Sequence, residues 1–354
     1  MISSLARLGQ RLLAARLKAF SLAAVALLAG CSANPIYTTT GVVLSNYSEG
    51  EATPYVLQMS DPQMACALGE GVDPLLYSFS RVTQAPDSTG SLLMLLAGNC
   101  AEYEAWEAQL AYLRADYEGN VEAAKDAREV AKRMNALTAK RRYASFLRAM
   151  AAYEFDPSAE PLECPFLFNE QDEITFLLGL LTGMQAIVND ANSGAMAGVP
   201  KSIAPQAERA ATCLDNEKWG GTPNAIRALV WLLLPDTRPA LSPDPWQVLE
   251  HSRELAVEKG IRVPHALQAV AAETFGRPDK LEEAIASFVE ANATVDVWDD
   301  YRLVDEVAAG VVRFSSDKHW TASYGHRTPQ TFFGKMSPDR GTENVETMNL
   351  DDLL

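Results

Sequence analysis

Apolar positions recur at helical spacing along most of the chain from Asp61 onward. One such series is Leu92, Leu95, Leu96, Trp106, Leu110 and Leu113. The spacing predicts helices over 61–82, 91–113, 120–152, 172–190, 200–214, 223–234, 245–259, 263–275, 278–292 and 299–312. Alternation with a period of two is rare, which argues against a sheet. The pattern therefore predicts an all-α protein.

Proline residues mark several helix starts. Asp61-Pro62 has the form of an N-cap followed by Pro at the first helical position, and four of the later helices open with Pro in or near the first turn. A cluster of Pro157, Pro161 and Pro165 ends the helix over 120–152. The pattern predicts a helical domain over 61–314, and it leaves open a division into two halves near 155–168.

The two flanking segments read as irregular. Residues 32–55 are rich in Ser, Thr, Asn, Gly and Pro, which predicts an extended tether over 31–60. Within it only the stretch 37–44 looks strand-like. Residues 315–354 are expected to be an irregular, acidic tail, because 337–354 hold five acids and one base.

The predicted helices follow one another with short connections, which favours antiparallel helical pairs. Each pair needs a neighbour to cover its apolar face. The sequence therefore predicts a degenerate tetratricopeptide-like array or another α-solenoid. No clean 34-residue period is found, so this prediction rests on helix spacing and composition.

The N-terminus carries an export signal. Residues 1–30 hold four bases and no acid, and end in an apolar stretch. Leu28-Ala29-Gly30-Cys31 resembles the lipobox of bacterial lipoproteins. The resemblance implies cleavage before Cys31 and acylation of Cys31, and Ser32 directs such a lipoprotein to the periplasmic face of a Gram-negative outer membrane. An ordinary signal peptide or an uncleaved anchor is the alternative.

Charge sharpens this picture. The chain has 46 acids, 30 bases and a net charge of −16, which argues against a nucleic-acid binder. Removal of residues 1–30 leaves 26 bases against the same 46 acids, a net charge of −20. So acidic a body is repelled by anionic headgroups, and we expect it to stand off the membrane on its tether.

Four further cysteines, Cys66, Cys100, Cys164 and Cys213, follow the lipobox. An even number in an exported chain favours disulfides. Three pairings are possible, and we favour Cys66–Cys100 with Cys164–Cys213, since each joins neighbouring helical segments. Buried free thiols are the alternative. No CxxC and no closely spaced His pair occurs, so no metal site is predicted.

Familiar catalytic patterns are missing: there is no HExxH, GxSxG, P-loop or Rossmann fingerprint. We therefore predict no catalytic residue and no cofactor, and favour a binding lipoprotein over a structural one or an enzyme with an unrecognised site. The candidate ligand or partner surface is Arg141, Arg142, Tyr143, Trp219 and Trp231. Arg suits carboxylate contacts, and Trp219 before Gly220-Gly221 is either a pocket lip or a core-covering side chain.

The stretches Ala131-Lys132-Arg133-Met134 and Ala139-Lys140-Arg141-Arg142-Tyr143-Ala144-Ser145-Phe146 resemble an Ala/Arg/Tyr-rich helix of the TatT family. These periplasmic lipoproteins are associated with some TRAP transporters. The resemblance implies tetratricopeptide-like helical pairs, homo-oligomers, and a pore or cleft that works with a solute-binding protein. The candidate disulfides, the acidic tail and the lack of a repeat consensus depart from the family, and no binding residue is carried over.

Overall fold

The computed structural model describes residues 34–338, and these residues form helices and loops without a β-strand. The prediction of an all-α protein is confirmed. The α-helices are α2 (Pro35–Tyr47), α3 (Thr53–Leu57), α4 (Pro62–Ser78), α5 (Asp87–Tyr117), α6 (Val121–Ala152), α7 (Glu170–Ser193), α8 (Ile203–Ala211), α9 (Thr222–Leu233), α10 (Pro245–Lys259), α11 (Val263–Thr274), α12 (Pro278–Ala291) and α13 (Arg302–Tyr324).

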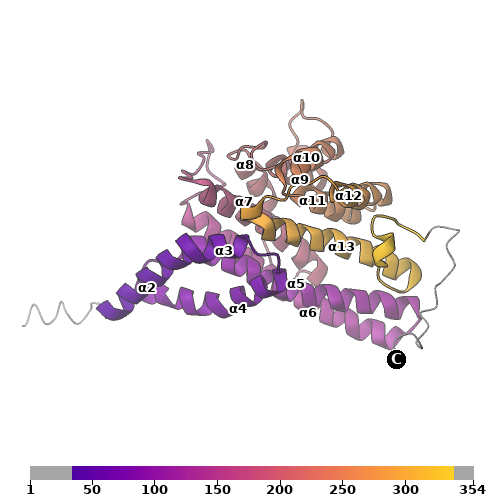
Figure 1. The fold of residues 1–354 in the computed structure, drawn as a ribbon, viewed down its shortest axis with the longest axis horizontal. Helices are drawn as coiled ribbons and strands as arrows, with labels where there is room; N and C mark the ends of the chain where they lie inside the picture. Colours follow the sequence, from indigo (N-terminus) through magenta and orange to yellow (C-terminus); the bar gives the residue numbers. More distant parts are fainter. Residues whose placement is uncertain (1–33, 339–354) are drawn as a thin grey trace, which may run out of the picture.

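Helices that follow one another in the chain pack as neighbours, from α4 against α5 through to α11 against α12. This confirms the predicted array of helical pairs. The long α5 and α6 run side by side along the molecule, and the shorter α8–α12 gather beyond α7 (Figure 1). The last helix, α13, returns across the array to contact α5, α11 and α12. The end of the helical region is therefore packed against its beginning.

Small residues let the long helices approach closely. A Cβ at Gly69 of α4 would lie 2.6 Å from the backbone of Leu93 and Ala97 of α5, and one at Gly179 of α7 would lie 2.4 Å from the Ala149 side chain of α6. Both contacts exclude any larger residue without a shift of backbone or core.

Two disulfides fix segments of this array, and their pairing is the one favoured from the sequence. Cys66–Cys100 joins α4 to α5, and Cys164–Cys213 ties the connection between α6 and α7 to the end of α8. Both cross-links restrict the unfolded chain. They hold α4 against α5, and the connection between α6 and α7 against the segment at the end of α8.

A single main core spans the connection over 153–169. Its buried residues include Phe146 and Met150 before the connection and Phe176 and Leu180 after it. Helix α7 is apolar and long enough to cross a membrane by length and composition alone, but 78% of its most apolar window is buried inside the protein. It has the surroundings of a core helix, and the two sides of the connection share one interior.

The N-terminal segment differs from the expected extended tether and strand. Residues 35–57 form α2, a π-helical turn at 48–52, and α3. The Asn34 side chain accepts a hydrogen bond from the Ile36 N–H (3.0 Å), and Pro35 occupies the first turn. Gly41 packs on Phe79 at the end of α4. A good cap and this contact outweigh the low helix propensity of the β-branched residues.

The C-terminal segment also differs in part from the irregular tail predicted over 315–354. Helix α13 continues to Tyr324, past the predicted end at residue 312, and Ser315, Ser316, Trp320 and Thr321 of this extension are buried. The Trp320 indole N–H donates to the Lys335 carbonyl oxygen (2.9 Å), so residues 325–338 fold back on the helix. The rest of the predicted acidic tail, 339–354, lies outside the described residues, as do the signal segment 1–30 and Cys31.

Candidate ligand-binding cavity

A cavity of about 500 Å³ lies between the long helices and α13, a volume within the range of ligand pockets in proteins. Leu and Val dominate its walls. The apolar lining comes from α4, α5, α7, α11 and α13, and includes Leu68, Val72, Leu92, Leu95, Leu96, Leu181, Val188, Leu267, Val270, Val304, Val307 and Val311. Such walls favour an apolar ligand by removing its surface from water.

The cavity is elongated. Its lining on α5 runs from Thr89 to Gln109, about 30 Å at the usual rise of an α-helix. On α13 it runs from Leu303 to Lys318, about 22 Å by the same measure. The N-terminal helices supply one end through Leu44 and neighbouring residues. The shape suits an extended chain better than a compact ring system.

Polar side chains interrupt the apolar wall at one place. Arg142 of α6 is almost fully buried and forms a two-pronged ion pair with Glu102 of α5, with its Nη1 2.7 Å from Glu102 Oε1. The same Nη1 donates to Asn189 Oδ1 (2.7 Å), and Nη2 donates to Asn99 Oδ1 (3.2 Å). Asn189 in turn donates to Asn135 Oδ1 (3.0 Å). All five residues line the cavity. We call them the Arg142 cluster.

The Arg142 cluster has donors to spare. Within the described residues, Arg142 Nε and Asn99 Nδ2 are buried and have no hydrogen-bond partner. An unpaired buried donor costs about 1–3 kcal/mol. Glu102 already balances the Arg142 charge, so an acceptor for these two donors need not carry a charge.

A second polar group lies toward the far end of the cavity. Lys318 of α13 forms an ion pair with Glu273 of α11 (2.8 Å), and both residues line the cavity together with Gln185, Asn192 and Ser315. Nearby, Trp106 and Phe314 stack with ring centroids 4.5 Å apart. The lining thus passes from apolar, through the Arg142 cluster, to a mixed aromatic and polar end.

The predicted surface residues are not brought together. Only Arg142 lines the cavity. The Arg141 guanidinium donates to the Ala97 carbonyl (2.6 Å) and pairs with Glu70 (2.5 Å), while Tyr143 packs against the main core. Both arginines are paired with carboxylates, so an organic anion would have to compete with Glu70 for Arg141 and with Glu102 for Arg142.

The two tryptophans also lie away from the cavity. Trp219 is 1% exposed, donates from its indole to Glu173 (2.9 Å) and stacks on Trp298. Trp231 is buried and donates to Glu208 (3.2 Å). Of the two interpretations that the sequence left open for Trp219, its burial fits the core-covering side chain and not the pocket lip. From the sequence alone, a Trp before a Gly-Gly turn is compatible with both a pocket lip and a core-covering side chain.

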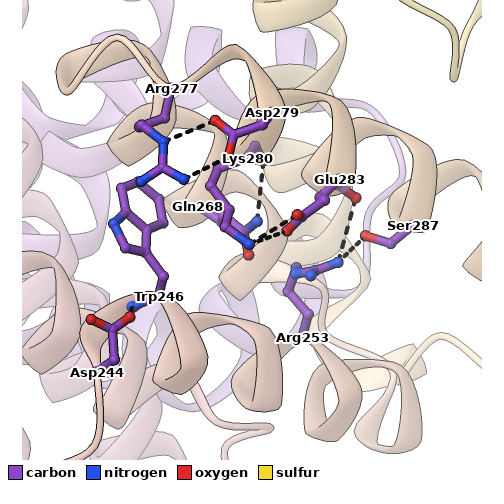
Figure 2. A network of polar contacts seen from close by, with 9 residues as sticks. All are labelled: Asp244, Trp246, Arg253, Gln268, Arg277, Asp279, Lys280, Glu283 and Ser287. Atoms are coloured by element: carbon purple, nitrogen blue, oxygen red, sulfur yellow. Dashed lines mark hydrogen bonds and ion pairs between the residues drawn. The ribbon is translucent and has the colours of Figure 1, made fainter.

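The polar network on α10, α11 and α12 is a separate feature (Figure 2). There Arg277 lies over the Trp246 ring and pairs with Asp279, while Arg253 reaches Ser287 on α12. Gln268 donates to the Lys280 carbonyl (3.1 Å). No residue of this network lines the cavity. Its contacts hold three neighbouring helices together.

Comparisons with known proteins identify no relative: no protein-family model, no curated protein and no solved structure matches the chain. The resemblance to the TatT family therefore remains a prediction. Sequence reasoning selected Arg142 but missed Glu102, Asn99, Asn135 and Asn189. Polar residues on otherwise apolar helix faces were the available signal, since a buried polar side chain needs partners.

Proposed function

We propose that the chain is a non-catalytic envelope lipoprotein that binds an elongated, mainly apolar organic ligand between its helices. The observation that carries the proposal is the cavity of about 500 Å³, with Leu and Val on most of its walls. Native cores rarely leave voids larger than a water molecule. A long apolar space kept among well-packed helices is best explained by a ligand that fills it.

The ligand class follows from the lining. A long isoprenoid chain, or an unbranched acyl chain, matches the length of the α5 wall. An uncharged carbonyl oxygen matches the spare donors of Arg142 and Asn99. A free carboxylate is less well suited, because Glu102 lies within the same cluster. Acyl esters and amides are thus the favoured ligands.

The proposal also includes where the protein is located and which protein it works with. Acylation of Cys31 would hold the protein at the periplasmic face of the outer membrane. The resemblance to TatT suggests that it hands its ligand to, or accepts it from, a periplasmic solute-binding protein of a TRAP-type transporter. Helical arrays commonly present surfaces for such partners.

Displacement of a fluorescent probe tests the binding step. The probe is the methyl ester of cis-parinaric acid, a naturally fluorescent fatty acid, added to the purified full chain. We expect saturable fluorescence enhancement, and we expect Val307→Trp to weaken binding about tenfold or more because the larger side chain fills the cavity. Val307 lines the cavity, so the effect is direct.

Val121→Trp is the matched control, because Val121 is exposed at the start of α6 and does not line the cavity. It should bind the probe as the unmodified chain does. Equal binding by both variants, or no saturable binding by the unmodified chain, would contradict the proposal. Mass spectrometry of lipids extracted from the purified protein identifies the natural ligand.

A further inference from the structure

Helix α2 lies at one end of the molecule (Figure 1), and several of its apolar side chains are exposed. Ile36, Val43 and Tyr47 are spaced so that they share one helix face, and they are 69%, 59% and 61% exposed. The buried Gly41 and the half-buried Thr38 lie on the opposite side and attach the helix to the body, and the Thr38 hydroxyl donates to the Val82 carbonyl (3.4 Å). The face formed by Ile36, Val43 and Tyr47 is here called the α2 face.

The charge pattern singles out this helix. Residues 32–48 contain no Asp, Glu, Lys or Arg, although 21% of the chain is charged and its net charge is −16. The equally exposed Val121 of α6, by contrast, is followed directly by Glu122 and soon by Lys125. Tyr side chains are enriched at membrane–water interfaces, and entry of this helix into the interface would bury no charged side chain.

The distance to the anchor points the same way. The first described residue, Asn34, is three residues after Cys31, and three residues span at most about 11 Å. An acylated Cys31 would therefore hold the start of α2 within that distance of the lipid headgroups. A stand-off on a long flexible tether is not possible, because residues 35–57 are helical and packed on the body.

We infer that the α2 face lies in the headgroup region of the bilayer that anchors the protein. Leu44 and Tyr47 of the same helix line the end of the cavity, so that this end adjoins the membrane. A lipid-derived ligand then has a short path between bilayer and cavity. The inference rests on the anchoring at Cys31 that the proposed function includes.

Photo-crosslinking in membranes tests it. The full chain, with its signal sequence, is produced in a Gram-negative host with the photoreactive residue p-benzoylphenylalanine at position 43 or 121. Val43 and Val121 form a matched pair, since each is a valine exposed at 59%. After irradiation, mass spectrometry should find phospholipid adducts at position 43 at least about tenfold above those at position 121.

Each other outcome overturns a distinct statement. An acylated Cys31 peptide with equal lipid adducts at the two positions refutes the membrane contact and leaves the binding function untouched. Adducts at position 43 with a second copy of the chain, or with another protein, show that the α2 face is a protein interface instead. A Cys31 peptide without acyl chains refutes the anchor and this inference together, whereas probe binding to the cavity is measured independently.

Discussion

Arg142 and Arg262 are both buried, and each faces a carboxylate with two nitrogens of its guanidinium, yet their surroundings differ. Arg262 Nε and Nη2 donate to Asp305 at 3.0 and 2.6 Å, Nη1 donates to Asn292, and the guanidinium lies 4.1 Å from the centre of the Phe288 ring. All of its donor nitrogens are in use. Arg142 keeps Nε unpaired, beside a long cavity.

The comparison separates a structural ion pair from one suited to binding. The Arg262–Asp305 pair joins the start of α11 to α13, and the Arg262 backbone N–H also donates to Asp305 (2.8 Å). Breaking this pair leaves the buried Arg262 charge without a counter-charge. The Arg142 cluster borders a space that a ligand or water can enter, so its polar groups can find new partners.

The largest expected effect is on stability. Asp305→Ala should lower the free energy of unfolding by about 3–5 kcal/mol, because it leaves the buried Arg262 charge uncompensated. Urea denaturation measures the loss. Asp299→Ala removes an exposed ion pair with Arg302 and should change stability little. Similar losses for both variants would show that the buried pair has no special role.

The next largest expected effect is a loss of stability at low pH, which comes from the protonation of His265 near Arg262. Burial, with the charges of Arg253 and Arg262, lowers the pKa of His265 to about 3. In the unfolded chain this histidine titrates near pH 6.5, so the unfolded state binds the extra proton between these values. Stability is therefore lost as the pH falls below 6.5, by about 2 kcal/mol at pH 5.

Urea denaturation at pH 7 and pH 5 checks this prediction in His265→Phe, which keeps an aromatic ring against Phe288. The unmodified chain should lose about 2 kcal/mol more between the two pH values than the variant does. The exposed His251 provides the control as His251→Phe. If all three proteins lose stability equally, His265 is not the group responsible.

At the cavity the expected change is in selectivity. Glu102→Gln leaves the Arg142 charge unbalanced, so the cluster should come to prefer a carboxylate. We expect binding of cis-parinaric acid relative to its methyl ester to rise about tenfold, equivalent to about 1.4 kcal/mol. Competitive fluorescence titration measures the ratio. An unchanged ratio would show that ligands do not reach the Arg142 cluster.

The smallest effect concerns the spare donor. Asn99→Ala should weaken binding of the methyl ester about fivefold, since one hydrogen bond contributes about 1 kcal/mol. The Arg142–Glu102 pair is left in place, so the selectivity between acid and ester should hold. A loss of affinity as large as that of Val307→Trp would instead indicate collapse of the cavity.

The helices were predictable because their signals are local. The helix over 245–259 was expected with Pro at its start and is observed at those bounds. The Asp244 side chain, which accepts from the Trp246 N–H (3.0 Å), caps it. Helix α2 was missed, although Asn34-Pro35 is the same kind of start, because the run Thr38-Thr39-Thr40 favours strands. The cap was the stronger signal.

The sequence by itself determined the all-α class and most helix bounds, since caps and apolar spacing act over short distances. It favoured the observed cysteine pairing but left the other pairings open. Only the tertiary structure decided where side chains meet. Glu102 and Asn189 reach Arg142 from 40 and 47 residues away, and Trp219 is covered by residues from α7 and from the segment before α13. A cavity forms where neighbouring helices do not come into contact, and the packing of whole helices decides where this happens.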